Sequence, residues 1–194
     1  MKKIKSICVY CGSSSPKNPL FKEAAAEFGK ILAKEKIRLV YGGGRVGLMG
    51  VIAETVFKNK GEVVGIIPEH IQDKEVRNND VTELLVVDSM HTRKRMMVEK
   101  SDGFVVLPGG FGTLDETFEI LTWKYLKLHD KPVVFLNTAD FYTPMMDMVE
   151  HMIGSGFTPA WQKTMFRIVN SPEEVMQALL SQKTENIRPD LKHL

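Results

Sequence analysis

The chain has 194 residues and a formal net charge of +2, because 26 lysines and arginines nearly balance 24 aspartates and glutamates. A chain of this length can bury one substantial core, so we expect one domain over residues 1–183, followed by a polar tail at 184–194. The small net charge argues against a broad surface for nucleic acid or membranes, and we expect neither as a partner.

The first predicted strand covers residues 4–12 and contains both cysteines, Cys8 and Cys11. Positions three apart on a strand point to opposite faces, so the two thiols are not expected to form a redox pair or half of a metal site. We interpret them as structural thiols in a reducing compartment. The apolar run at 7–10 is too short for a secretory signal, and a cytoplasmic location is therefore expected.

Strand-like and helix-like segments alternate along the rest of the chain. Ser89 and Ser171 stand where helix N-caps are expected, and Pro172 suits a first helical turn. The expected strands cover residues 4–12, 37–44, 62–68, 82–88, 103–110, 131–137 and 166–171. The expected helices cover residues 18–36, 47–61, 89–102, 113–128, 142–154 and 171–182, and the polar segment 69–80 is expected to be a loop.

This alternation predicts a single α/β domain with a Rossmann-like, doubly wound parallel sheet and helices on both faces. In such sheets, ligands bind beyond the carboxyl ends of the strands. The unusual segments of the sequence stand at these ends: CGSSS, YGGGRVG, PEHIQDKE and LPGGFGT each follow a predicted strand. The sequence therefore predicts a ligand site at this edge of the sheet.

The segment LPGGFGT opens a predicted helix and contains Gly109, Gly110, Gly112 and Thr113. Glycines let the backbone approach a ligand, and a helix N-terminus attracts anions, so we interpret this loop as a phosphate site. The alternative is a glycine-rich turn without a ligand. A Walker motif is absent, and the glycines at 42–44 follow the second strand instead of the first, so a mononucleotide is favoured over a dinucleotide.

Glu116 lies one turn after Thr113 and shares its helix face, so its carboxylate is expected near the sugar of a bound nucleotide. Asp115 and Glu119 also have a structural explanation, because acids favour the first turns of a helix. Arg93 follows a strand end, where a guanidinium can reach a phosphate or a carboxylate. No metal motif is present, and we expect neither a metal nor a cofactor.

The motifs VYGGGRVGLMG, MHTRK and PGGFGTLDE together resemble those of the LOG ("lonely guy") family. These are cytokinin riboside 5′-monophosphate phosphoribohydrolases, and many members carry the label "possible lysine decarboxylase". The resemblance covers nearly the whole chain. One departure is the GTLDE of this chain, where members often have GTLEE; Glu116 is retained.

The resemblance implies an N-glycosidase that releases the free base and ribose 5-phosphate from AMP or N6-modified AMP. It further implies a homodimer, or a larger assembly of dimers, and catalytic roles for Arg93 and Glu116. The substrate contacts that it implies are Glu75, Arg93, Lys94, Gly110, Phe111, Gly112, Thr113, Leu114, Asp115, Glu116 and Thr122. The loops after the strands add Gly12, Ser13, Gly43, Gly44, Met90 and Gly109 to the expected contacts.

Two other functions compete with this interpretation. A non-catalytic carrier of a nucleotide or of the molybdenum cofactor would have a similar fold, but the presence of both Arg93 and Glu116 favours an enzyme. A pyridoxal phosphate decarboxylase would need a lysine for the Schiff base, and no lysine here has a convincing setting for it. Two alternatives remain for Arg93, which can hold the phosphate or orient Glu116.

Overall fold

The computed structural model describes residues 4–71 and 81–182. Its centre is a sheet of seven strands in the order β4-β3-β2-β1-β5-β6-β7, and every neighbouring pair is parallel. The strands are β1 (Ser6–Tyr10), β2 (Arg38–Tyr41), β3 (Val63–Pro68), β4 (Glu83–Val87), β5 (Gly103–Val106), β6 (Val133–Leu136) and β7 (Arg167–Val169). The strand order reverses between β1 and β5, which is where such sheets bind ligands.

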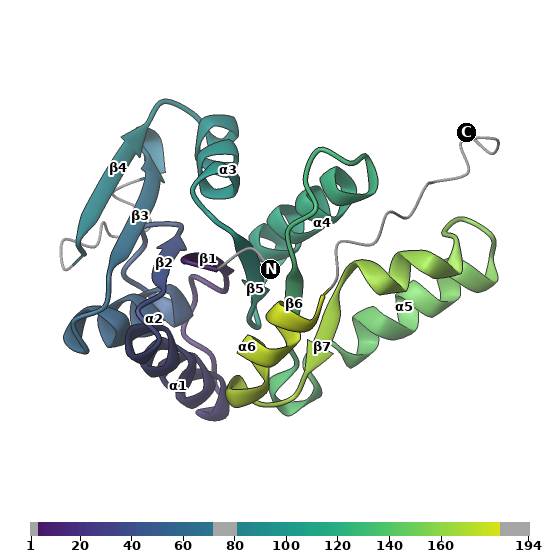
Figure 1. Ribbon diagram of the computed structural model, residues 1–194, viewed down its shortest axis with the longest axis horizontal. Helices are drawn as coiled ribbons and strands as arrows, with labels where there is room; N and C mark the ends of the chain where they lie inside the picture. Colours follow the sequence, from purple (N-terminus) through teal and green to yellow (C-terminus); the bar gives the residue numbers. More distant parts are fainter. Residues whose placement is uncertain (1–3, 72–80, 183–194) are drawn as a thin grey trace.

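Helices cover both faces of the sheet, and Figure 1 shows α1, α2 and α6 along its lower side and α3 and α4 along its upper side. Packing against the two core clusters places α5 on the same face as α3 and α4. The α-helices are α1 (Leu20–Lys34), α2 (Gly47–Lys58), α3 (Met90–Glu99), α4 (Phe111–Tyr125), α5 (Thr143–Gly154) and α6 (Pro172–Ser181). The predicted single-domain, Rossmann-like architecture is confirmed.

Alternate residues of each central strand enter different cores, as the period of two along a strand requires. Cys11 lies in the cluster beneath α1, α2 and α6, whereas Cys8 lies in the cluster beneath α3, α4 and α5. Both cysteines are buried, and neither is in a disulfide. The prediction that these thiols lie on opposite faces is confirmed.

Each predicted strand and α-helix exists in the structure, and the differences are at element ends. Ser89 caps α3, accepting a hydrogen bond from the Thr92 backbone N–H at 3.1 Å, and Ser171 forms a capping box with Glu174. Three short 3₁₀ segments were not predicted: η1 (Glu69–Ile71), η2 (Thr138–Asp140) and η3 (Ala160–Met165). Such pieces are too short to leave a periodic pattern in sequence. The predicted polar tail lies outside the described residues.

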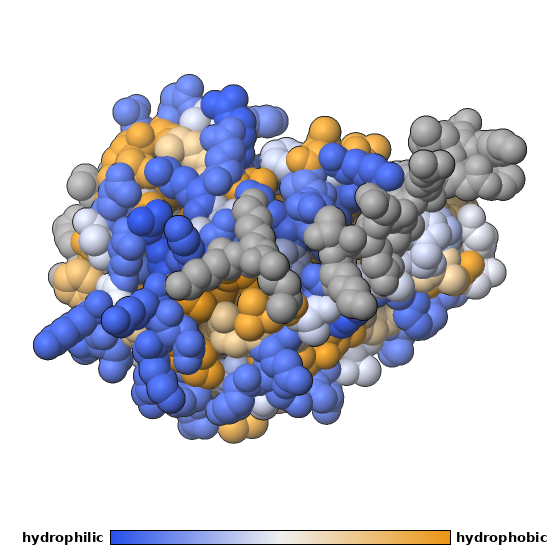
Figure 2. Space-filling view, in the orientation of Figure 1, coloured by the Kyte–Doolittle hydropathy of each residue, from blue (hydrophilic) through white to orange (hydrophobic). Residues whose placement is uncertain are grey.

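Hydrophobic residues lie in patches among hydrophilic residues on the face drawn in Figure 2. On the face drawn in Figure 2, hydrophilic residues predominate. Within residues 4–71 and 81–182, no helix is long and apolar enough to cross a lipid bilayer.

His129, in the loop between α4 and β6, predicts a pH-dependent stability. Its Nε2 lies 2.8 Å from the carbonyl oxygen of Ile120, and its Nδ1 accepts from the Lys131 N–H at 3.1 Å. Burial lowers the pKa of His129 to about 4. The unfolded chain takes up this proton near pH 6.5, so stability is lost as the pH falls from about 6.5 towards 4.

Between pH 7 and pH 4.5, we expect His129 to account for a loss of about 2 kcal/mol in unfolding free energy, after allowance for its partial exposure. Urea titrations at several pH values measure this slope. His129→Gln should flatten it, and His151→Gln, at an exposed position of α5, is the matched control. Equal slopes in the wild type and in His129→Gln would contradict the assignment.

Candidate active site

A cavity of about 580 Å³ lies at the carboxyl ends of the central strands, where the sequence predicted a ligand site. The segments that follow β1, β3, β5 and β6 contribute to it, together with the starts of α1, α2, α3 and α4. Its polar and glycine lining comprises Gly12, Ser13, Ser14, Ser15, Arg93, Gly109, Gly110, Gly112, Thr113, Asp115 and Glu116. Its apolar lining includes Phe21, Leu48, Met49, Ile71, Met90, Phe111 and Phe141.

The loops around this cavity interlock through their backbones. The Gly12 N–H donates to the Pro108 carbonyl at 3.0 Å, and the Leu48 N–H donates to the Gly12 carbonyl at 2.9 Å. Gly47 has a φ of 68°, and a Cβ there would lie 2.5 Å from the carbonyl carbon of Ser13. Only glycine allows this approach, so the N-terminus of α2 is held against the loop after β1.

The predicted phosphate loop forms the start of α4. The helix begins at Phe111, two residues earlier than expected, so Gly112 and Thr113 belong to its first turn. No side chain caps α4, in contrast to α3 and α6. A Cβ at Gly109 would lie 2.1 Å from Thr113 Oγ1, whereas one at Gly110 would meet nothing within 4 Å. The packing therefore requires Gly109, while Gly110 leaves space beside the helix N-terminus for an anion.

Arg93 reaches the same cavity from α3. Its side chain is buried, with 4% of the residue exposed, and its Nη2 donates to the Gly42 carbonyl at 2.9 Å. Its Nη1 lies 3.6 Å from Met90 Sδ. A Cβ at Gly42 would lie 2.1 Å from Nη2, so the first glycine of YGGG provides room for this arginine. The residues between β2 and α2 thus position a cation that comes from 51 residues later in the chain.

Glu116 lines the cavity together with Thr113, as their spacing predicted. It is half-buried and lies at helical spacing from the buried residues Thr113 and Ile120 of α4. Burial raises the pKa of Cys8, and the negative charge of Glu116 raises it further. The site therefore places a carboxylate, a buried guanidinium and an uncapped helix N-terminus around one space.

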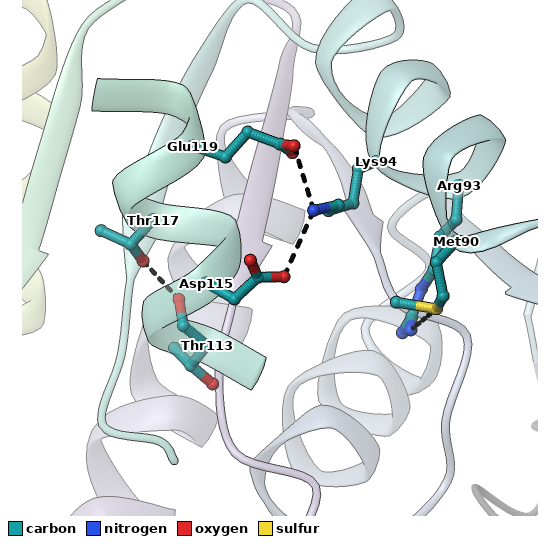
Figure 3. A network of polar contacts seen from close by, with 7 residues as sticks. All are labelled: Met90, Arg93, Lys94, Thr113, Asp115, Thr117 and Glu119. Carbon is teal, nitrogen blue, oxygen red and sulfur yellow. Dashed lines mark hydrogen bonds and ion pairs between the residues drawn. The ribbon is translucent and has the colours of Figure 1, made fainter. Parts of the chain in front are cut away.

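Lys94 points in a different direction from Arg93, although the two are neighbours on α3. Figure 3 shows its ammonium between two carboxylates of α4, 3.2 Å from Asp115 and 3.0 Å from Glu119. Lys94 does not line the cavity in the described part of the chain; it borders a separate groove of about 220 Å³ with Glu119 and Trp123. The sequence did not predict this bridge between helices.

The other expected contacts divide into two groups. Gly12, Ser13, Met90, Gly109 and Phe111 line the cavity. Within the residues that the structure describes, the following expected contacts lie outside its lining: Gly43, Gly44, Lys94, Leu114 and Thr122. Glu75 lies outside the described residues.

The residues outside the lining have other environments. Gly43 has a φ of 79° and packs on Ile67, which explains the glycine conformationally. Leu114 packs against the core beneath α3 and α4. Thr122 is exposed in a groove of about 150 Å³ beside α5.

Two aromatic residues of the cavity, Phe21 and Phe141, were not predicted. Their rings meet edge to face with centroids 5.7 Å apart. The turn before Phe141 contains Ala139 and Asp140 with φ values of 50° and 56°, a conformation that L residues adopt at a cost. The only sequence signal for Phe141 was its position shortly after a strand end.

Comparison with known proteins identifies the relatives of this chain. The family described as "Possible lysine decarboxylase" matches residues 49–179. The cytokinin riboside 5′-monophosphate phosphoribohydrolase of Rhodococcoides fascians is 46% identical over 158 residues, which are 80% of each chain. An Arabidopsis thaliana enzyme of the same description is 38% identical over 184 residues, 95% of this chain and 81% of the relative. The chain belongs to this phosphoribohydrolase family, the LOG family.

Solved structures that resemble this LOG family member support the fold alone. The molybdenum cofactor binding protein of Rippkaea orientalis superposes with a TM-score of 0.69 at 22% identity, covering 93% of this chain and 98% of that chain. The molybdenum cofactor carrier protein of Chlamydomonas reinhardtii gives a TM-score of 0.68 at 19% identity, with the same coverage. At this identity the likeness says nothing about the ligand.

Proposed function

We propose that this protein hydrolyses the N-glycosidic bond of AMP and of N6-modified AMP, releasing the free base and ribose 5-phosphate. Relatives with 38–46% identity over 80–95% of the chain are cytokinin riboside 5′-monophosphate phosphoribohydrolases. The observation that carries the proposal for this chain is the convergence of Arg93, Glu116 and the start of α4 on one cavity. The substrate is therefore a nucleotide with a terminal phosphate.

The phosphate is bound at the N-terminus of α4 in this proposal. Backbone N–H groups of the first turn and the Thr113 hydroxyl supply donors, and the helix dipole favours the negative charge. Space beside Gly110 and Gly112 allows the anion to approach the backbone. Binding energy at the phosphate then holds the sugar in place for reaction at its other end.

Glu116 acts at the anomeric carbon. As the bond from C1′ to the base nitrogen breaks, its electron pair leaves with the base, and the sugar develops positive charge. The carboxylate stabilises this charge and accepts the proton of the water whose oxygen attacks C1′. The departing base takes up a proton, so the products are free base and ribose 5-phosphate. Arg93 supplies a fixed cation, which holds the phosphate or orients Glu116.

The test is incubation with AMP, isopentenyl-AMP and adenosine, followed by chromatography for the free base. We expect both nucleotides to be cleaved, and adenosine to react at least about 100-fold more slowly, because it lacks the group that the α4 N-terminus binds. Equal turnover of AMP and adenosine would contradict the proposed phosphate site. Binding of AMP without release of base would favour a carrier protein.

We also propose that the protein is a homodimer that uses the face formed by α4 and α5. The LOG resemblance implies a dimer, and the groove that contains Thr122 is lined by exposed Phe118 and by apolar residues of α4 and α5. Met148 on α5 and Phe157, which follows α5, are also exposed. Exposed apolar groups at such a groove are typical of protein interfaces. A second copy covering this face would also account for Thr122 as a substrate contact, because Thr122 does not line the cavity of its own chain.

The methionines of α3 and α5 give little support to this dimer. Met97 is fully buried, and Met96, Met145 and Met146 pack against the core, whereas Met148 is exposed. Core packing explains most of these residues.

Sedimentation of the wild type at micromolar concentration should give at least twice the 21.9 kDa mass of the chain. Phe118→Glu should shift the protein towards the monomer, because it places a charge in the apolar groove. Phe57→Glu is the matched control, since Phe57 on α2 is as exposed as Phe118 and lies on the other side of the sheet. A monomeric wild type would exclude the dimer.

The predicted cytoplasmic location forms part of the same proposal. The support is chemical: Cys8 and Cys11 are not in a disulfide, as is usual in a reducing compartment.

A further inference from the structure

Tyr142, in the segment between β6 and α5, contacts the entry to the predicted phosphate loop. The tyrosine is buried, and its hydroxyl donates to the Leu107 carbonyl at 2.8 Å. Leu107 is also buried and stands between the end of β5 and Pro108, so this carbonyl belongs to the peptide bond that leads into the loop. A side chain from a separate segment therefore holds the backbone at the point where the phosphate loop begins.

The same stretch of backbone is held from the other side by β1 and the loop that follows it. The Leu107 N–H donates to the Tyr10 carbonyl at 2.9 Å, and the Gly12 N–H donates to the Pro108 carbonyl at 3.0 Å. In the sheet, β5 lies between β1 and β6, and Tyr142 approaches from the β6 side. The start of the phosphate loop is thus anchored from both neighbours of β5.

The position of Tyr142 is itself fixed by its surroundings. Its backbone N–H donates to Asn137 Oδ1 at 2.7 Å. Its ring meets that of Phe135 on β6 edge to face, with centroids 5.1 Å apart, and meets that of Phe141 in the same way at 5.0 Å. The hydroxyl therefore reaches the Leu107 carbonyl from a ring with little freedom to move.

The turn before Tyr142 gives two neighbouring residues different tasks. Phe141 lines the cavity, whereas Tyr142 enters the core. Ala139 and Asp140 reach this arrangement through the positive φ values described above. Such conformations cost free energy and persist where the surrounding structure requires them, often beside functional sites. The strained turn therefore couples the wall of the cavity to the support of the phosphate loop.

A buried tyrosine hydroxyl needs an acceptor in any protein, so the bond to Leu107 is by itself compatible with a purely structural role. Burial raises the pKa of Tyr142 well above its usual range, and the hydroxyl remains a donor at neutral pH. What distinguishes this bond is the place of its acceptor. The Leu107 carbonyl comes three residues before Gly110, beside which there is space for an anion.

We propose that Tyr142 is a positioning residue, which sets the phosphate loop at the N-terminus of α4 through its hydrogen bond to the Leu107 carbonyl. The inference rests on the proposed function, in which this N-terminus binds the 5′-phosphate. Tyr142 does not line the cavity within residues 4–71 and 81–182, so it acts on the substrate through the loop backbone. Hydrogen bonds from backbone N–H groups weaken steeply with misalignment, and a small displacement of the loop therefore weakens phosphate binding.

Tyr142→Phe tests the proposal, because it keeps the ring and removes only the hydroxyl. We expect the Kd of ribose 5-phosphate, measured by calorimetry, to rise about fivefold. The KM for AMP should rise about as much, with kcat within about twofold of the wild type, because the loop holds the phosphate equally in the ground state and in the transition state. Inhibition by adenine, which has no phosphate, should not change.

Ser101→Ala is the matched control. The Ser101 hydroxyl is also buried and donates to a carbonyl, that of Met97, at 2.7 Å. Ser101 precedes β5, at the end of the strand opposite to the phosphate loop. Both variants should lower the thermal midpoint, because each removes a buried hydrogen bond. Only Tyr142→Phe should weaken the binding of ribose 5-phosphate per folded molecule.

Asn137→Ala provides a second route to the same contact, because it removes the acceptor that positions the Tyr142 backbone. We expect it to raise the Kd of ribose 5-phosphate about threefold. The double variant Asn137→Ala, Tyr142→Phe should bind no more weakly than Tyr142→Phe alone, since both changes act through one hydrogen bond to Leu107.

Three results would overturn the role of Tyr142. One is an unchanged Kd of ribose 5-phosphate in Tyr142→Phe with a lower thermal midpoint, as in Ser101→Ala, which would leave the hydroxyl a part of the fold alone. Another is an equal weakening of ribose 5-phosphate and adenine, which would indicate a disturbance of the whole cavity. The third is a fall in kcat at constant KM, which is not expected of a phosphate contact.

Failure of the proposed function gives a different result. A wild type that binds ribose 5-phosphate but releases no base from AMP would contradict the hydrolase, and the affinities of the variants for ribose 5-phosphate would still decide the role of Tyr142. A wild type that does not bind ribose 5-phosphate would overturn both proposals.

Discussion

Turnover of AMP by the Glu116→Gln variant is expected to fall about 10²–10³-fold, while KM changes little. The carboxylate faces the cavity from the second turn of α4, beside Thr113 of the first turn. The amide preserves the size and can still bind a ribose hydroxyl, so ground-state binding should survive. It cannot neutralise the positive charge that the sugar develops as the base departs, nor take the proton of the attacking water. Steady-state kinetics with AMP measure the effect.

Glu99→Gln is the control for this substitution, because Glu99 ends α3 on the exposed surface and only its pair with Arg95 would be lost. Its kinetics should match those of the wild type. If Glu116→Gln lowered AMP turnover as little as Glu99→Gln, the carboxylate of Glu116 would only stabilise the helix. A non-catalytic nucleotide-binding protein would then be the better description.

The second large effect is expected at Arg93. Arg93→Ala should lower kcat/KM for AMP about 10²–10³-fold, with contributions from both a higher KM and a lower kcat. The guanidinium is buried at the cavity wall, where charge-assisted hydrogen bonds are stronger than in water. Its removal takes away the fixed cation of the site and also leaves the Gly42 carbonyl without its donor at 2.9 Å.

Gly42→Ala offers an independent way to disturb the same group. The new Cβ would lie 2.1 Å from Arg93 Nη2, at the flexible end of a long side chain, so the guanidinium should move while the backbone stays. We expect a loss of activity in the same direction as for Arg93→Ala, with a smaller loss of stability. Arg95→Ala is the control for both. If Gly42→Ala and Arg93→Ala each kept full activity, a role for the guanidinium in catalysis would be excluded.

The glycines of the chain show how much can be predicted from the local sequence pattern. LPGGFGT was interpreted as a phosphate loop, and the structure places it at an uncapped helix N-terminus that faces a cavity. The glycine run at 42–44 was set aside as a dinucleotide loop because it follows the second strand. Its first member instead makes room for Arg93, and Gly43 adopts a positive φ against Ile67. A glycine-rich sequence indicates that space beside the backbone is needed. It does not show whether a ligand or a distant side chain fills that space.

Lys94 and Thr122 show the corresponding limit for polar residues. Spacing along a helix identifies which residues share a face, but not what that face contacts. Lys94 follows Arg93 directly, yet it points to α4, where Asp115 and Glu119 bind it. Asp115 and Glu119 were explained by the helix dipole, and the bridge adds a second reason for both acids. Thr122 is on the same helix as Glu116 but lies near α5, outside the cavity lining.

The sequence by itself determined the order and type of the strands and α-helices, the parallel sheet and the edge at which the cavity lies. These properties follow from local hydrophobic period, from caps such as Ser89 and Ser171, and from the rule that parallel strands end together. Only the tertiary structure decided that Gly42 serves Arg93, that Lys94 bridges α3 and α4, and that Phe21 meets Phe141. Each of these is a contact between residues at least 20 positions apart, and a linear pattern carries no information about which distant side chains will occupy the same space.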